Sequence, residues 1–393
     1  MISVDQAKQI ILDHTTPLSA ICKPLLSAVG HITTMDIFSP IDLPPFPQSS
    51  MDGYAFAFND LSTCSSLEVK HKIAAGDTST YRIQEGEAVR IFTGAPIPTG
   101  ADTVVMQEKT ELKSDQLFIM DNSLQLGSNY RHQGAEIQAH SLALPKGSRL
   151  TPPAIGFLAS MGVEEVEVYR SPTLCILVTG DELTPQGQNL EYGKVYDSNS
   201  YTLIAAFKQA GIEEVTVSHI HDQLEQLTLA LTDALSQYDV IVLTGGVSVG
   251  DYDYVTQAAL ESGVEPLYHK IKQKPGKPMY CGVKDHRLVF GLPGNPASAL
   301  TCFYEYLEPA LMKMMGQVSA IKILHAPITA AYKKPVGITH FLKAYYDGHH
   351  VKPLDAQESF RLNSFAHANA LIVIGEEVTE VIEGMDVEVH ILP

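Results

Sequence analysis

Short apolar runs alternate with segments of helical periodicity through the middle of the chain. Residues 174–179, 215–220 and 240–243 are rich in Val, Ile and Leu, as expected for buried parallel strands. Helical segments at 200–210 and 223–236 separate them, and another helix follows the third strand. This alternation predicts a doubly wound α/β domain of roughly 150 residues.

The flanking segments follow other patterns. A capping box from Ser3 to Gln6 predicts a first helix, and four prolines favour an extended arm without regular structure before a strand near Tyr54. Residues 67–120 carry β signals, and the hairpin at residues 347–348 introduces further strands. We therefore expect a multidomain α/β plus β fold in three parts: residues 1–170, an elongated region with a β domain inserted at about 54–140; residues 171–318, the doubly wound α/β domain; and residues 319–393, a C-terminal β barrel.

Composition narrows the choice of partners and compartment. The net charge of −18 argues against nucleic acid or an anionic membrane as a partner. The five cysteines are far apart and include no C-x-x-C pair, which predicts buried free thiols. No apolar window approaches about 18 residues, and the first residues lack a signal-peptide pattern, so we expect a cytoplasmic protein.

A glycine-rich turn at residues 245–250 follows the strand at 240–243 and precedes a helix, an arrangement that suits an anion. It is not a Walker A loop, because Asp251 and Tyr252 stand where Lys and Ser or Thr are needed. Asp251 and Asp253 would repel a bare phosphate but could hold a divalent cation beside one. The alternative is a tight turn with two helix-capping aspartates.

Four polar loops follow strand ends of the predicted sheet: residues 179–183, residues 220–222, the glycine turn and residues 291–296. In the last of these, Asn295 is expected to be the N-cap of a long helix. Because ligands of such sheets bind outside the carboxyl ends of the strands, the convergence of these loops predicts a binding site.

Lysines form one dense basic patch just before the last of these loops. Lys270, Lys272 and Lys274 recur at period two, so in one extended strand they would share a face, and Lys277 follows on a Pro-Gly turn. This favours binding of an anionic ligand. The alternative is an edge strand that lysines protect against aggregation.

Other polar positions are ambiguous when considered alone. Asp52 stands on a tight turn at the end of the arm, where an ordinary turn aspartate is equally well explained. Glu136 lies in a polar turn with Arg131 and His132, which by itself is typical of a solvated loop. The loop at residues 357–368, which includes Ser364, is polar enough to contact a ligand.

Motifs spread along nearly the whole chain resemble one family in the expected order. They are PPFPQSSMDGYA, TGAPIPTGADTVVMQE, VTGDEL, TGGVSVGDYDY, KPGKP and FGLPGNPAS. This set resembles the molybdopterin molybdenumtransferase family, known in bacteria as MoeA and in animals as the E domain of gephyrin. The resemblance implies a homodimer with the active cleft between subunits. It also implies ligation of molybdate to adenylylated molybdopterin, with Mg²⁺-dependent cleavage of the pyrophosphate link and release of AMP.

The resemblance also assigns roles to residues. Together with the loops described above, it predicts a catalytic set, a substrate-binding set and a metal-binding set: catalytic Asp52, Glu136, Glu182, Asp222, Asp253, Lys270 and Lys274; substrate-binding Thr93, which the resemblance assigns, and Gly245, Gly246, Ser248, Gly250, Lys277, Pro293, Gly294, Asn295 and Ser364, which lie in those loops; and, for Mg²⁺, Glu182, Asp222 and Asp253. Two positions depart from the family pattern. Glu136 stands where aspartate is usual, and Lys343 stands where arginine is frequent, which would lose bidentate anion binding if that position touches the ligand.

The pattern of charges agrees with such a substrate. An adenylylated pterin is strongly anionic, and carboxylates near it require a bridging cation. Molybdate, a tetrahedral dianion, needs its own donors, which the lysine patch and the C-terminal loop could supply.

Three alternatives remain open from the sequence. A molybdopterin adenylyltransferase or a CinA-like nucleotide hydrolase would share the α/β domain but lack the flanking motifs. A scaffold of the gephyrin E-domain type, which could also contact other molybdenum cofactor enzymes, would bind a partner without needing an intact site. The preference between molybdate and tungstate, and which lysine holds which anion, also stay open.

Overall fold

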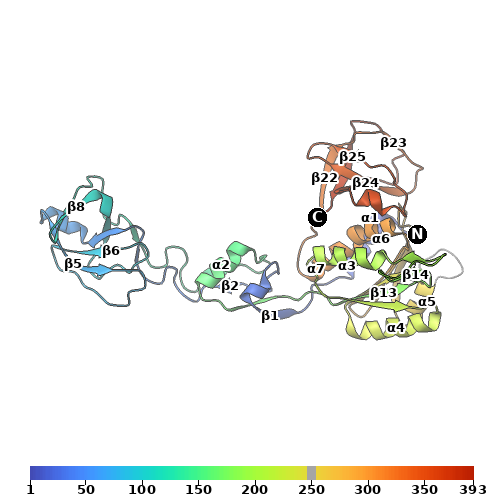
Figure 1. The fold of residues 1–393 in the computed structure, drawn as a ribbon, viewed down its shortest axis with the longest axis horizontal. Helices are drawn as coiled ribbons and strands as arrows, with labels where there is room; N and C mark the ends of the chain where they lie inside the picture. Colours follow the sequence, from blue (N-terminus) through green and yellow to red (C-terminus); the bar gives the residue numbers. More distant parts are fainter. Residues whose placement is uncertain (246–253) are drawn as a thin grey trace. The chain divides into compact units, whose positions relative to one another are not determined.

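The computed structural model describes residues 1–245 and 254–393 and divides into two compact units (Figure 1). Unit 1 comprises Met1–Ile21, Gly30–Ile32 and Val168–Pro393, and unit 2 comprises Cys22–Val29 and Thr33–Glu167. The boundary falls within β1 (Ala20–Pro24) and β12 (Glu165–Tyr169).

A six-stranded sheet forms the centre of unit 1. Its strands in spatial order are β16 (Val215–Ile220), β13 (Leu174–Thr179), β17 (Val240–Thr244), β21 (Arg287–Leu292), β20 (Pro278–Lys284) and β18 (Glu265–Lys270). The first four are parallel: Leu174 pairs with Val215 and Val240, and Val240 pairs with Leu288. Their carboxyl ends therefore lie along one edge, as the alternating pattern of the sequence predicts.

Helices cover both faces of this sheet. In β13, Ile176 and Val178 pack in one core cluster with α1 (Val4–Asp13), α3 (Asn199–Gln209) and α6 (Pro296–Cys302), whereas Cys175 and Leu177 pack in the other with α4 (Leu224–Gln237) and α5 (Tyr254–Glu261). The alternation follows from the opposite directions of successive side chains in a strand. The doubly wound domain is thus confirmed. The long helix expected after Asn295 is present, but a π-helical turn, η4 (Phe303–Leu307), joins α6 to α7 (Glu308–Met314).

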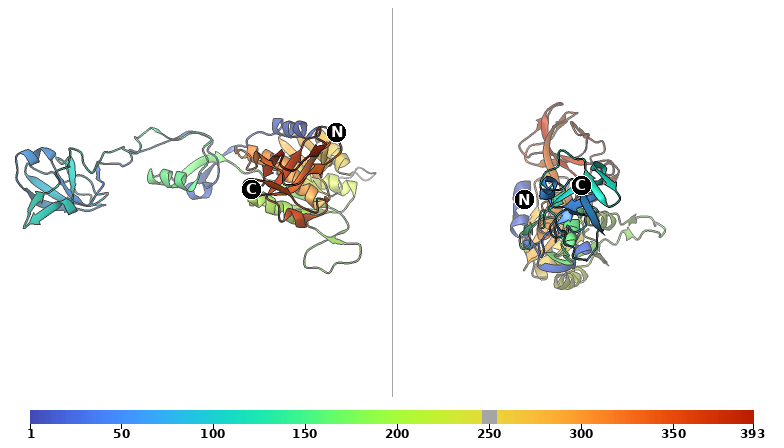
Figure 2. Two further views of the ribbon diagram at one scale, coloured as in Figure 1. Left: turned by 90° about the horizontal axis from the view of Figure 1, so that it is seen from above. Right: turned by 90° about the vertical axis from the view of Figure 1, so that its left-hand side faces the viewer.

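Unit 1 also contains the C-terminal β structure, a curled sheet with its own apolar core. Its strands in order are β19 (Gln273–Lys274), β24 (Thr339–Tyr346), β26 (Ala370–Ile374), β28 (Asp386–Ile391) and β22 (Lys322–Pro327), with β25 (Val351–Pro353) paired to β24. The pair β23 (Tyr332–Lys333) and β27 (Glu380–Val381) and the short helix α8 (Leu362–Phe365) complete it. A separate segment, between β14 (Leu183–Thr184) and β15 (Val195–Tyr196), projects from unit 1 as a long loop (Figure 2).

Unit 2 contains a second six-stranded sheet with the order β7 (Thr103–Met106), β4 (Gly53–Phe56), β6 (Glu87–Ile91), β5 (Leu67–Ile73), β9 (Gln116–Ile119) and β8 (Thr110–Lys113). The short helices η1 (Leu25–Ala28), η2 (Phe58–Ser62), η3 (Gln107–Lys109) and α2 (Pro152–Ser160) also belong to it. Its core clusters lie on the two faces of β4 around Ala55 and Phe56.

The proline-rich arm differs from its prediction. We expected no regular structure before β4, yet β2 (Ile37–Phe38) pairs with β11 (Leu142–Leu144), and β3 (Gln48–Ser49) pairs with β10 (Tyr130–Arg131). The prolines lie outside these two-residue strands, so no ladder hydrogen bond is lost. The arm therefore has packing partners in its own unit, and its order does not require a second body. No helix in the described part of the chain is long and apolar enough to cross a membrane.

Candidate functional site

The strand order of the unit 1 sheet reverses between β13 and β17. From β13 the chain first adds β16 at one side of β13, and it then returns to add β17 at the opposite side. At this point the Thr179 hydroxyl donates to the Thr244 carbonyl oxygen at 3.3 Å. Gly245 has a φ of +84°, and a Cβ there would lie 2.1 Å from the Thr179 carbonyl oxygen. Only glycine fits. Ligands of open α/β sheets bind at such a switch point.

Three carboxylates surround this end of the sheet. Asp181 and Glu182 follow β13, and Asp222 follows β16. Oδ1 of Asp222 is buried and has no hydrogen-bond partner among the described residues. Burial raises the pKa of Asp222, and the charges of Asp181 and Glu182 raise it further. The predicted residues Glu182 and Asp222 are thus close enough for the charge of Glu182 to act on the desolvated carboxylate of Asp222. Keeping both carboxylates ionised costs free energy unless a positive charge balances them.

The fit of a divalent cation can be judged from these residues. Among residues 1–245 and 254–393, no group of three or more potential ligand side chains lies close enough to hold a metal ion. Glu182 and Asp222 supply two carboxylates, and the buried, unpartnered oxygen of Asp222 is a suitable donor for a hard cation. The third predicted ligand, Asp253, lies outside the described residues, as do Gly246, Ser248 and Gly250. The described residues therefore supply two of the three predicted carboxylates, and the binding of Mg²⁺ stays a prediction.

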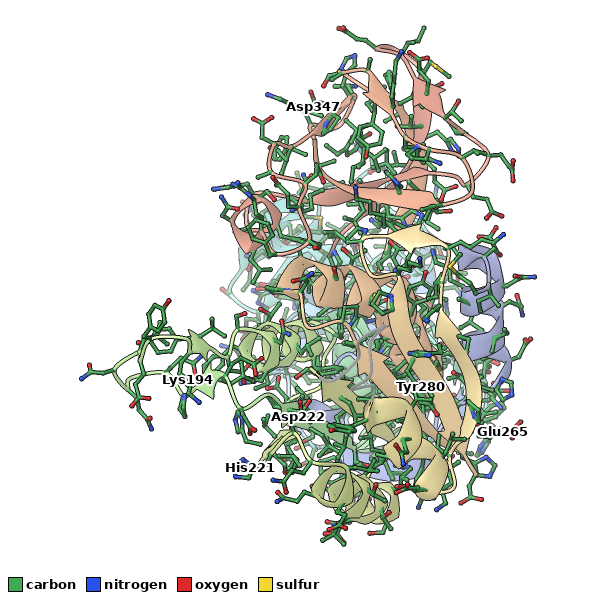
Figure 3. The ribbon with its side chains drawn as sticks, turned by 90° about the vertical axis from the view of Figure 1, so that its right-hand side faces the viewer. Lys194, His221, Asp222, Glu265, Tyr280 and Asp347 are labelled. Atoms are coloured by element: carbon green, nitrogen blue, oxygen red, sulfur yellow. The ribbon has the colours of Figure 1, made fainter. Side chains whose placement is uncertain are left out.

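Next to the predicted site residues, Asp181 and His221 form a contact that the sequence reasoning missed. His221 Nδ1 lies 3.1 Å from Asp181 Oδ1, and this contact is the main cause of a lowered pKa of Asp181. Lys194, on the projecting loop, donates to the Asp181 carbonyl oxygen. Figure 3 shows His221 and Asp222 side by side at the end of β16. Both residues lie in loops that the sequence singled out, but their neighbours Glu182 and Asp222 were chosen instead.

The loop before α6 meets the C-terminal region. Asn295 occupies the N-cap position as expected, but its side chain makes no cap hydrogen bond; its Nδ2 donates to Ser359 Oγ at 2.9 Å. Asn199 Nδ2 donates to the Gly294 carbonyl oxygen at 2.9 Å, and Pro293 is buried. The loop 293–295 is thereby fixed at the same sheet edge as Gly245.

The prediction of one lysine strand is wrong. Lys270 ends β18 in the α/β sheet, whereas Lys274 belongs to β19 in the C-terminal sheet. Between them Ile271 forms a bridge with Ile2, and the Lys272 amide donates to the Ile2 carbonyl oxygen at 2.8 Å, so the strand is interrupted. Lys272 pairs with Glu376 at 3.3 Å. The period-two spacing therefore does not place Lys270 and Lys274 on one strand face.

Lys274 lines a pocket of about 520 Å³ at the edge of the C-terminal sheet. Its wall includes His340 and residues 356–360. Burial, followed by the charges of Lys274 and Lys334, lowers the pKa of His340 to about 4, and its Nδ1 lies 2.8 Å from the Tyr332 hydroxyl. Lys277 is exposed and is not among the residues that line this pocket.

Ser364 does not behave as a ligand-facing residue in this structure. Its side chain is buried, and its hydroxyl donates to the Ala356 carbonyl oxygen at 2.9 Å. It is not among the residues lining the pocket, whereas Ser359 of the same loop is. The polar composition of the loop predicted its proximity to a ligand but could not distinguish these two serines.

In unit 2, Asp52 and Thr93 are in direct contact. The Thr93 amide and hydroxyl both donate to Asp52 Oδ1 at 2.8 Å. These two bonds, the amide bond first, lower the pKa of Asp52, so the carboxylate is held ionised in a fixed orientation. Glu136 lies elsewhere in the unit, with Arg131 in a pocket of about 340 Å³ that Asp52 does not line.

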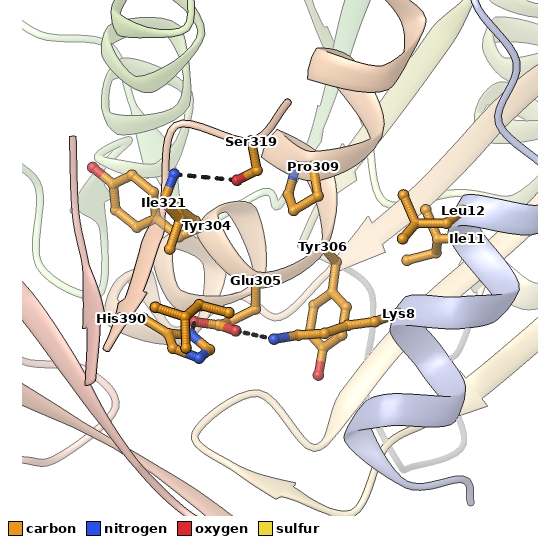
Figure 4. A pocket seen from close by; sticks show the side chains of 11 residues that line it. Lys8, Ile11, Leu12, Tyr304, Glu305, Tyr306, Pro309, Ser319, Ile321 and His390 are labelled. Carbon is orange, nitrogen blue, oxygen red and sulfur yellow. Dashed lines mark hydrogen bonds and ion pairs between the residues drawn. The ribbon is translucent and has the colours of Figure 1, made fainter. Parts of the chain in front are cut away.

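A separate cavity of about 200 Å³ lies in unit 1 and is lined mainly by apolar side chains (Figure 4). At one end the fully buried Glu305, on η4, pairs with Lys8 Nζ at 2.6 Å and with His390 Nδ1 at 2.8 Å. His390 Nε2 also lies 2.9 Å from Glu388. None of the predicted site residues lines this cavity, and its charged groups are paired with one another.

Comparisons with known proteins agree with the resemblance seen in the sequence. Three family profiles match: MoeA N-terminal region (domain I and II) at residues 2–162, probable molybdopterin binding domain at 175–313, and MoeA C-terminal region (domain IV) at 325–392. The exact boundaries of our three predicted domains remain a prediction.

Relatives match along the whole chain. Molybdopterin molybdenumtransferase of Haemophilus influenzae is 35% identical over 99% of this chain and 98% of its own, and that of Staphylococcus epidermidis is 35% identical over 95% and 91%. The crystal structure of the molybdopterin biosynthesis MoeA protein of Pyrococcus horikoshii matches with a TM-score of 0.86 and 29% identity, covering 100% of this chain and 99% of that one. The chain therefore belongs to the molybdopterin molybdenumtransferase family, whose members are transferases of molybdenum cofactor biosynthesis.

Proposed function

We propose that the protein inserts molybdate into adenylylated molybdopterin and releases AMP, with the pyrophosphate of the substrate held at the switch point of the unit 1 sheet. The observation that carries the proposal is the buried Oδ1 of Asp222, which has no hydrogen-bond partner among the described residues and lies at the carboxyl edge of the unit 1 sheet. A desolvated carboxylate oxygen at this edge suits a cation bridging to phosphate oxygens.

In this proposal Glu182, Asp222 and Asp253 hold Mg²⁺. When bound, Mg²⁺ would neutralise charge that develops on the pyrophosphate as its link is cleaved. Asp181 does not bind the metal in this proposal. Its side chain contacts His221 and so orders the turn that carries Asp222. Lys270, at the end of β18, supplies a positive charge for the anionic substrate.

Molybdate is proposed to enter the pocket lined by Lys274. A tetrahedral dianion requires hydrogen-bond donors and positive charge, and this pocket offers the exposed Lys274 ammonium and the Ser359 hydroxyl. Pocket residue Ser359 also contacts Asn295, which borders the proposed substrate edge. This contact within unit 1 gives the two anion sites a shared boundary.

The sites in unit 2 complete the proposal. Asp52, held ionised by Thr93, and Glu136, in its separate pocket, are proposed to act on the substrate in a homodimer. Because the arm is ordered within its own unit, the proposal of a homodimer rests on the resemblance alone. Size-exclusion chromatography with light scattering tests it: a dimer at micromolar concentration is expected, and a stable monomer would contradict it.

The function is tested by incubating the purified protein with adenylylated molybdopterin and Mg²⁺, with or without molybdate, and measuring AMP by chromatography. We expect AMP release that requires both molybdate and Mg²⁺ and that Glu182→Gln abolishes. A protein that binds the substrate tightly but never releases AMP would be a scaffold instead. AMP release that continues unchanged without molybdate would indicate a nucleotide hydrolase.

A further inference from the structure

We infer that Lys343 is a positioning residue, which holds the loop of residues 356–361 so that the loop presents its amide N–H groups and the Ser359 hydroxyl to an oxyanion in the Lys274 pocket. The inference rests on the proposed function, since it assigns the oxyanion as molybdate. It concerns a position where the resemblance implies arginine and this chain has lysine. On this account Lys343 acts on the anion through the loop and does not touch it.

The contacts of Lys343 show that it serves the loop. The residue lies on β24 with 3% of its surface exposed, and it does not line the pocket. Its Nζ donates to the carbonyl oxygens of Ala356 at 2.7 Å, Arg361 at 3.0 Å and Glu358 at 3.3 Å. These three bonds use all three protons of the ammonium group. The loop therefore wraps around one buried cation.

Peptide geometry then determines what faces the pocket. The C=O and N–H of a trans peptide point in opposite directions, so carbonyls turned toward Lys343 turn the next amides away from it. The carbonyls of Ala356 and Glu358 thus turn the amides of Gln357 and Ser359 away from Lys343; in the described part of the chain these two amides donate to no protein acceptor, and both residues line the pocket. Free backbone N–H groups that converge on a concave site bind an anion.

The loop is fixed at two further points. Gln357 Oε1 accepts from the Lys343 amide at 3.0 Å, while its Nε2 donates to the carbonyl oxygens of Lys343 and Leu354. At the other end, Ser359 Oγ accepts from Asn295 Nδ2, and the Ser359 carbonyl oxygen accepts from the Ala297 amide at 3.1 Å. Because Ser359 Oγ is an acceptor in that bond, its own proton remains available to the anion.

The charge of Lys343 contributes as well. No carboxylate forms an ion pair with its Nζ among the described residues, so only carbonyl dipoles compensate the charge. A buried cation behind one layer of loop attracts a dianion in front of it, and burial limits the screening by salt. Burial lowers the pKa of Lys343, and the charge of Glu358 opposes this effect.

The test uses the full-length protein and isothermal titration with molybdate alone, together with the steady-state KM for molybdate in AMP release. Lys343→Met removes the charge and the donors at similar volume, Lys343→Arg keeps both, and Lys352→Met removes an exposed lysine of neighbouring β25 as the matched control. We expect Lys343→Met to raise the molybdate Kd and KM about tenfold to a hundredfold, while the Kd for adenylylated molybdopterin changes less than about twofold. Lys343→Arg should restore part of the affinity, and Lys352→Met should match the wild type.

An unchanged molybdate Kd in Lys343→Met would overturn the inference, and so would an equal loss of affinity for both ligands, which would indicate general loosening. If Lys343→Met does not fold, Ser359→Ala and Gln357→Ala test the same loop: each should weaken molybdate several-fold, and no change in either variant would refute the role of the loop. If the wild type binds molybdate but releases no AMP, the proposed function fails, yet the titrations still decide the role of Lys343.

Discussion

Replacing Asp222 by Asn should make the protein more stable in a chelator and less stable than the wild type in Mg²⁺. In the wild type the charge of Asp222 is unfavourable, because burial and the carboxylates of Asp181 and Glu182 raise its pKa. A raised folded pKa in an acid means that stability falls as pH rises through the ordinary Asp value toward the folded one. The neutral amide of Asn removes this penalty at neutral pH.

The magnitude follows from the two like-charge contacts. Asp222 is only half-buried, so solvent limits its repulsion from each of the two carboxylates to about 0.2–1 kcal/mol. Removing both repulsions should stabilise the chelator-treated protein by about 0.4–2 kcal/mol. For a unit of this size that corresponds to a rise in Tm of about 1–8 °C. Mg²⁺ at about a hundred times its Kd should stabilise the wild type by about 2.7 kcal/mol. The variant should lose most of that gain, so the order of the two melting curves should reverse.

Differential scanning calorimetry of both proteins in EDTA and in millimolar Mg²⁺ measures this reversal. Asp233→Asn, an exposed carboxylate on α4 of the same unit, is the control and should follow the wild type in both buffers. The reasoning is refuted if Asp222→Asn melts below the wild type in EDTA, or if Mg²⁺ stabilises it as much as it stabilises the wild type.

Three further predictions concern groups elsewhere in the molecule. Glu305→Gln should cost about 3–5 kcal/mol, because it removes a fully buried partner of Lys8 and His390. Burial opposes both charges, yet the ion pairs lower the pKa of Glu305 and raise that of His390. The difference in Tm between wild type and variant should therefore be largest between the ordinary pKa values of the two groups, about pH 4.5–6.5, and should shrink as pH rises further. A difference in Tm that does not depend on pH would contradict this. His340, whose pKa is about 4, should take up a proton when molybdate binds. The affinity for molybdate should therefore increase from pH 8 to pH 5 in the wild type and stay constant in His340→Gln. Equal pH profiles of the two proteins in calorimetric titrations would contradict this. Asp52→Ala should abolish AMP release with little change in Tm, because the side chain is exposed and, among the described residues, its hydrogen bonds come from Thr93; retained activity would place the site elsewhere.

The α/β sheet and its ligand edge could be predicted because they depend on local patterns. Runs of β-branched residues determine the buried strands β13 and β17, and their carboxyl ends must share an edge once the strands are parallel. Glu182 and Asp222 therefore met as expected. Gly245 was recognised as part of a tight turn, although its close approach to Thr179 depends on the pairing of two distant strands.

The errors arose where distant segments interrupt a local pattern. Lys270 and Lys274 share a periodicity, but the chain leaves the α/β sheet after Lys270, pairs with the N-terminal residue Ile2 at Ile271 and joins the C-terminal sheet at Gln273. No local signal in either segment predicts that contact. The ligand-facing roles proposed for Ser359 and His340 likewise depend on which side of the C-terminal sheet packs against the pocket, so composition alone led to Ser364 instead.

The most direct test of the central claim is a single-turnover reaction with adenylylated molybdopterin, molybdate and Mg²⁺, in which AMP and pterin-bound molybdenum are measured in the same samples. The account predicts that both appear with one time course and in a one-to-one ratio, and that Asp222→Asn suppresses both together. AMP that accumulates without molybdenum in the pterin, or molybdenum insertion that proceeds with the pyrophosphate link intact, would contradict it.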